Sequence, residues 1–126
     1  MNKEDIMNTS INNEFGKIVI EENAISFIAA NAAMSCYGLV GMASKSATDG
    51  IFELLSLKNQ NKGVKIRIEE EKLFIDLYVI IQFGTKISVV ATNIIDSVKY
   101  NVENFTGLNV EKVTVHVQDV RVQKEA

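Results

Sequence analysis

The sequence is poor in residues that cross-link a chain or hold it in a bilayer. Its 126 residues include one cysteine, Cys36, and no proline or tryptophan. A single cysteine excludes an internal disulfide, and no apolar run approaches the roughly 20 residues that span a bilayer. The first ten residues, MNKEDIMNTS, lack the apolar core of a secretory signal. These absences predict a cytoplasmic protein without direct membrane insertion.

The charge balance argues against nucleic acid as a partner. Thirteen basic residues against 16 acidic ones give a net charge of -3, whereas nucleic-acid affinity depends on clustered lysine and arginine. Hydrophobic residues make up 47% and charged residues 23% of the chain, which is typical of a globular protein. A chain of this length buries enough surface to fold without a disulfide or a metal.

The polar ends of the chain lack periodicity, so we expect flexible tails at residues 1–13 and 123–126. Residues 14–122 contain no linker and are predicted to form one domain. Within it, residues 16–20 (GKIVI) have the composition of a short strand.

Two segments have helical periodicity. The first follows strand 16–20 and is predicted to end at Gly38; the second is predicted to begin with Thr85 as its N-cap and to end at Gly107. A short helix capped by Thr48 or Asp49 is predicted between them. The apolar stripe of the first consists of Ile25, Ile28, Ala29, Ala32 and Cys36, and that of the second of Ile87, Val90, Ala91, Ile94, Val98, Val102 and Phe105.

Alternating apolar residues predict a β-hairpin over residues 63–83 and a final strand over residues 110–122. If Glu70 and Glu71 form the hairpin turn, Ile68 faces Leu73, Ile66 faces Ile75, Val64 faces Leu77 and Lys65 faces Asp76. The alternation of the final strand slips near Gln118 and Asp119, which indicates a β-bulge. The whole order predicts an α+β two-layer sandwich, with two long helices on one face of a mixed sheet of about four strands.

The sequence offers no catalytic, metal or cofactor site. Cys36 lies on an apolar helix stripe, where burial disfavours the reactive thiolate, and His116 is the only imidazole available for a metal. The acidic run Glu69–Glu71 is most simply a solvated hairpin turn. We therefore expect a protein without enzymatic activity.

The outward face of the predicted sheet is unusually apolar. Phe74, Tyr78 and Ile80 point away from the core around Asp76, and His116 points outward from the final strand. Such a face indicates an interaction surface for another molecule. The alternative, that the short helix or a tail covers this face, agrees equally well with the pattern.

Two further patterns concern phosphate groups. The loop Gly38–Gly41 (GLVG) resembles the GXXG loop of KH domains, so RNA binding is an alternative function, with Lys45, Arg67 and Lys17 as phosphate contacts. Its middle residues are apolar, however, which favours a tight turn. The turn at Gly84 could likewise hold a small anion, but a plain helix start explains it.

Three strings occur in order along the chain: GKIVIEENAISFIAANAAMSCYGLVGM, GVKIRIEEEKLFIDLYVIIQFGTKISVVATNI and VKYNVENFTGLNVEKVTVHVQDVRV. Together, from about Gly16 to Val122, they resemble the alkaline shock protein family of Gram-positive bacteria, also called the Gls-type envelope stress response family, in its short cytoplasmic form. The resemblance implies a non-enzymatic protein of cell-envelope homeostasis. It also implies a protein partner: some relatives bind a membrane-anchored protein, some occur beside a kinase-like protein, and some self-associate. No catalytic residues are established for that family, so none are assigned here.

Overall fold

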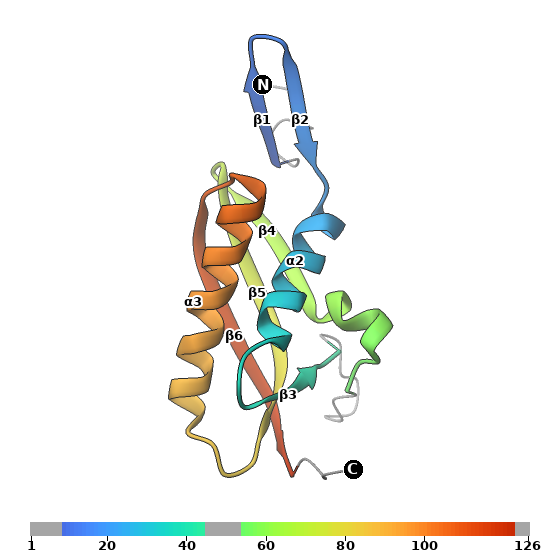
Figure 1. Ribbon diagram of the computed structural model, residues 1–126, viewed down its shortest axis with the longest axis vertical. Coiled ribbons are helices and arrows are strands. Elements are labelled where there is room, and N and C mark those ends of the chain that lie inside the picture. The colour runs from blue at the N-terminus through green and yellow to red at the C-terminus, as the bar shows by residue number, and fades with distance from the viewer. Residues whose placement is uncertain (1–8, 45–53, 123–126) are drawn as a thin grey trace.

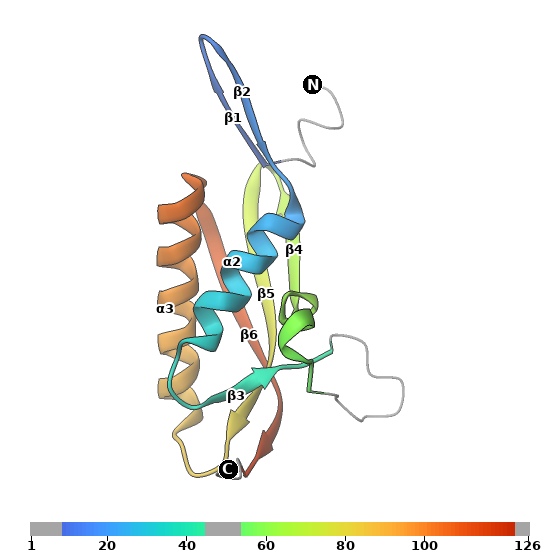
Figure 2. The ribbon, with the colours of Figure 1, turned by 45° about the vertical axis from the view of Figure 1, so that its right-hand side comes forward.

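Both long helices lie on one face of a single sheet, which confirms the predicted two-layer α+β architecture (Figures 1 and 2). The computed structural model describes residues 9–44 and 54–122. Helix α2 (Glu22–Met34) and helix α3 (Ile87–Thr106) pack against each other and against the sheet.

Strand β5 (Lys72–Gln82) borders every other strand of the main sheet. Strand β6 (Val110–Arg121) pairs with one edge of β5 in parallel. Two antiparallel strands share the other edge end to end, β4 (Val64–Glu69) along its first half and β3 (Leu39–Met42) along its second. The sheet is therefore mixed and four-stranded, as predicted.

The membership of that sheet differs from the prediction. Strand β2 (Gly16–Ile20) lies outside it and forms a separate two-stranded hairpin with β1 (Thr9–Asn13). The fourth strand of the main sheet is instead β3, where the sequence indicated a turn. Residues 9–13, assigned to a flexible tail, form a strand because their backbone pairs with β2 over five residue pairs.

The β4–β5 hairpin has the predicted register in all four residue pairs, including Lys65 opposite Asp76. Its turn residues Glu70 and Glu71 both have positive φ, 51° and 67°, as a two-residue type I′ turn requires. The predicted bulge in β6 is also present, because the register with β5 shifts by one residue at Gln118.

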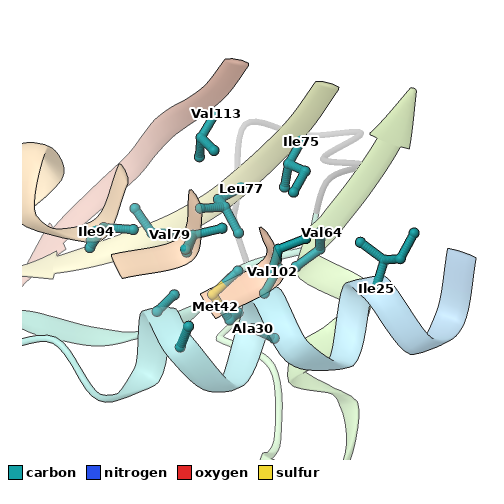
Figure 3. Close-up of a cluster of buried hydrophobic side chains, with 14 of the residues drawn as sticks. Ile25, Ala30, Met42, Val64, Ile75, Leu77, Val79, Ile94, Val102 and Val113 are labelled. Atoms are coloured by element: carbon teal, nitrogen blue, oxygen red, sulfur yellow. The ribbon is translucent and has the colours of Figure 1, made fainter. Parts of the chain in front are cut away.

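The core consists of side chains that the helices and the sheet direct at each other (Figure 3). The alanines of α2 let α3 approach closely, since they add little volume between the two helices. Members of the core from the two layers include Ile25, Ala29, Ala33, Val90, Ile94, Val98, Val102, Ile75, Leu77 and Val79.

The buried stripe of α3 is narrower than predicted, because Ile87 and Phe105 are exposed. The buried positions of this helix recur every four residues, from Val90 to Thr106. Phe105 lies about 100° around the helix from Thr106 and about 60° from Val102, so it is offset from both buried neighbours.

The helix ends also differ from the sequence prediction. Thr85 does not cap α3: the residue before the helix is Lys86, and the Thr85 hydroxyl donates to the Gln82 carbonyl at 2.7 Å. Gly107, with φ of 77°, ends α3 as predicted. Helix α2 ends at Met34, before Gly38 is reached.

The segment between β3 and β4 is only partly described. Thr48 and Asp49, predicted to cap a short helix, lie outside the described residues. Leu54 forms an isolated bridge with Ala43 and is not helical. The next element is the 3₁₀ segment η1 (Leu57–Gly63), which lies beside α2.

Candidate functional site

The candidate site lies on the face of the sheet opposite α2 and α3. Five side chains from the three longest strands of the main sheet meet there, and we call them the open-face cluster: Arg67 from β4, Phe74, Asp76 and Tyr78 from β5, and His116 from β6. Alternation along each strand directs them outward, while the residues between them enter the core.

Asp76 is the centre of this cluster. Its side chain is buried, and its residue is 7% exposed. Arg67 Nε donates to Asp76 Oδ2 at 2.7 Å, and His116 Nε2 lies 3.0 Å from Oδ1. Lys65 faces Asp76 in the register, but Arg67 forms the ion pair diagonally across the strands. One carboxylate thus connects β4, β5 and β6.

The surroundings of Asp76 keep it ionised. Burial acts to raise the pKa of its carboxyl, but the hydrogen bonds from Arg67 and His116 and the attraction to both side chains outweigh burial and hold this pKa below its ordinary value. Both oxygens of Asp76 thus have partners, and the carboxylate orients Arg67 and His116.

Aromatic rings complete the cluster. The guanidinium carbon of Arg67 lies 5.2 Å from the centre of the Phe74 ring, a cation–π arrangement. The Tyr78 and His116 rings stack, with centres 4.5 Å apart and planes 9° from parallel. Arg67 also pairs with Glu69 at 2.7 Å. These contacts fix side chains that would otherwise sample many rotamers.

The predicted interaction surface therefore needs a correction. Phe74, Tyr78 and His116 are half-buried and reach the surface, but Ile80 is 0% exposed and cannot touch a partner. Part of its cover is local, since Gly41 pairs with Ile80 and the Leu54 side chain lies where a Cβ of Gly41 would be. Arg67 belongs to the surface, as its alternation with Ile66 and Ile68 could have indicated.

The glycines of GLVG are used for packing. A Cβ on Gly38 would lie 2.6 Å from Val90 Cγ2, and the Gly38 carbonyl accepts from the Gln82 amide at 2.8 Å. Gly41 lies within strand β3 and pairs with β5.

Arg67, one of the proposed phosphate contacts, does not lie at that loop. Arg67 is opposite Phe74, six residues along β5 from Ile80, the partner of Gly41. At about 3.3 Å per residue this is about 20 Å. Lys45 lies outside the described residues. Among the described residues, Arg67 and the Gly38–Gly41 loop therefore do not form one phosphate site.

Other chemistry finds little support in the part of the chain that the structure describes. Within it, no group of three His, Cys, Asp or Glu side chains could hold a metal ion. Cys36 is half-buried, with its sulfur 3.6 Å from the Ala32 carbonyl oxygen. No helix of the described residues is long and apolar enough to cross a membrane.

Comparisons with known proteins place this chain in a family. The model of the alkaline shock protein family, described as having a cell envelope-related function, matches residues 10–122. The chain is 44% identical over 117 residues to the uncharacterized protein YloU of Bacillus subtilis, covering 92% of this chain and 98% of that protein. It is 37% identical over 120 residues to an uncharacterized protein of Streptococcus pyogenes serotype M6, covering 94% and 99% respectively. No solved structure matches. The resemblance seen in the sequence is therefore confirmed, and the chain belongs to the alkaline shock protein family, whose function is related to the cell envelope.

Proposed function

We propose that this chain is a non-enzymatic cytoplasmic protein of cell-envelope stress or homeostasis, and that it works by docking a protein on the open-face cluster. The observation that carries the proposal is the set of half-buried aromatic rings, Phe74 and Tyr78, held by a hydrogen-bonded network across three strands on a face that α2 and α3 leave uncovered. The partner that the family resemblance suggests is a membrane-anchored or kinase-like protein.

The physical basis is preorganisation. Binding normally costs the rotamer freedom of interface side chains, about 0.5–1.5 kcal/mol for each long one. Arg67 and His116 are already held by Asp76, so a partner meets them ordered. Aromatic and arginine side chains are also the residues that dominate binding energy in protein interfaces. The cluster thus has the composition and the rigidity of a docking site.

The test is photo-cross-linking in cells with a benzophenone amino acid at position 78 or at position 37. Tyr37 is a matched control because it is an exposed tyrosine in the loop after α2. We expect one recurrent protein to be trapped from position 78, and the Phe74→Ser substitution to abolish that product. A urea unfolding midpoint close to that of the parent will show that Phe74→Ser remains folded.

Two results would contradict the proposal. One is the same set of products from positions 78 and 37, which indicates non-specific contact. The other is a product from position 78 that survives Phe74→Ser in a folded variant, because the aromatic side chain would then contribute nothing to docking.

A further inference from the structure

The β1–β2 hairpin projects beyond the helices and the main sheet (Figures 1 and 2). Phe15 lies in its turn and is 92% exposed, and Ile18 and Val19 of β2 are about half exposed. A two-stranded hairpin is only marginally stable in water without a surface to pack on. Within one chain, these apolar side chains remain in contact with solvent.

The base of the hairpin is nevertheless fixed to the domain. Ile20 packs against the core, and Ile11 lies next to Gly107 at the end of α3, 3.3 Å from where a Cβ would be. At the other end, the Phe15 amide donates to Asn13 Oδ1 at 2.8 Å and orders the turn. The hairpin therefore presents its apolar residues in a defined position.

A second uncovered apolar feature lies between α2 and α3. A groove of about 590 Å³ runs between these helices, with Phe27 (66% exposed) and Phe105 (70% exposed) at its sides and Asn31, Ser97 and Asn101 among its polar residues. Phe105 is two residues from Gly107, so the groove reaches the end of the helix layer from which the hairpin projects (Figure 1).

We propose that a second copy of this chain docks here, with the hairpin of each copy lying in the α2–α3 groove of the other. Each chain carries a projecting hairpin with apolar residues and, at the same end of the domain, an apolar groove. In a two-fold symmetric dimer, the hairpin and the groove of each copy would both be occupied. Ile18 and Val19 lie on opposite faces of the hairpin, so one of them faces the groove. With Phe15, Phe27 and Phe105, the exposed parts amount to about 1,100 Å² for two copies, taking roughly 200 Å² for a phenylalanine. That area exceeds the roughly 1,000 Å² that a specific interface needs.

This inference rests on the proposed function only in assuming that the chain acts through protein contacts. It uses the helix side and the hairpin, whereas the open-face cluster lies on the opposite face of the sheet. A partner could therefore bind the open-face cluster of each copy while the two copies remain associated.

The first test is sedimentation velocity over a wide concentration range. We expect a reversible dimer, at least tenfold weaker after Phe15→Ser or Phe105→Ser because each substitution removes two symmetry-related contacts. Phe83→Ser is the matched control, since Phe83 is also exposed but lies in the β5–α3 turn at the opposite end of the domain. It should leave the dimer unchanged.

The second test identifies the contact itself. In a Cys36→Ser background, Phe15→Cys and Phe105→Cys chains carrying different tags are mixed and oxidised gently. We expect a disulfide-linked heterodimer joining the two introduced thiols, at a higher yield than either chain gives alone. Sedimentation of a monomer at every soluble concentration, or a dimer insensitive to both serine substitutions, would overturn the proposal. Tyr78→Ser should still form the dimer, and Phe15→Ser should still give the cross-linked product from position 78. Failure of the dimer proposal can therefore be told apart from failure of the proposed docking site on the open-face cluster.

Discussion

Replacing Gly38 by alanine tests whether GLVG serves packing, and Gly84 provides the matched comparison. Both glycines have positive φ, 89° and 95°. They differ in their surroundings: a Cβ on Gly38 would lie 2.6 Å and 3.2 Å from the two γ-methyl groups of Val90, whereas a Cβ on Gly84 would meet nothing within 4 Å. The two substitutions thus share backbone strain but not the collision.

The expected losses in unfolding free energy follow from these distances. Gly84→Ala should cost about 1–2 kcal/mol, the strain of a left-handed backbone for a residue with a Cβ. Gly38→Ala should cost that amount plus about 1–3 kcal/mol for forcing a methyl group into a packed site. With a urea dependence of about 1–3 kcal/mol/M, Gly38→Ala should lower the midpoint by about 1 M more than Gly84→Ala.

The assay is equilibrium urea unfolding followed by circular dichroism. A double-mutant cycle adds a direct check on the collision, because Val90→Ala removes both γ-methyl groups. Gly38→Ala should then cost less in the Val90→Ala background than in the parent. Equal losses for Gly38→Ala and Gly84→Ala, or a cycle with no coupling, would refute the packing role.

Three other predictions concern the open-face cluster, the helix ends and the RNA alternative. The pKa of Asp76 in the folded chain lies below the unfolded value of about 3.9. The stability that ionised Asp76 gives to the fold is therefore present above the unfolded pKa and is lost as the pH falls through the folded pKa. Thermal unfolding should show this loss in the parent and a smaller loss in Asp76→Asn. Thr85→Ala should lower the free energy of unfolding in urea by less than about 1 kcal/mol, because the Thr85 hydroxyl caps no helical amide. Gly107→Ala should lower it by about 1–2 kcal/mol, because Gly107 has a positive φ. Equal losses would contradict the assignment of the two ends of α3. Mixed single-stranded RNA should not bind at low salt, and binding that weakens steeply with added salt would restore the RNA alternative.

Local patterns predicted the elements whose determinants lie close together in the sequence. The β4–β5 register follows from strict alternation on both sides of Glu70 and Glu71. The bulge at Gln118 follows from one slipped alternation in β6. Helix α3 follows from the spacing of its apolar residues. The predicted buried stripe on it was too wide, because the sequence does not show where the sheet beneath the helix ends.

The elements that were missed depend on distant residues. Strand β3 looks like a turn because Gly38 precedes it and Gly41 lies within it, and only the edge of β5 makes it a strand. Strand β1 has a polar sequence and owes its structure to pairing with β2.

At the candidate site, alternation identified four members of the open-face cluster: Phe74, Asp76, Tyr78 and His116. Arg67 was not included in that surface, although its alternation with Ile66 and Ile68 places it opposite Phe74. Only its diagonal ion pair with Asp76 depends on side-chain reach that the pattern does not show. Alternation also placed Ile80 on this surface, but Ile80 is buried, and the residues that cover it are distant in the sequence.

The position of β5 between all the other strands of its sheet has a consequence for the order of folding. The β4–β5 hairpin closes a loop of two residues, so its formation costs little conformational entropy. It can therefore form as soon as both strands have left the ribosome. The parallel partner β6 reaches β5 only after the chain has passed through the twenty residues of α3. Until then one edge of the central strand, with its row of amide and carbonyl groups, is open to other nascent chains, and synthesis of the last strand is the event that closes it.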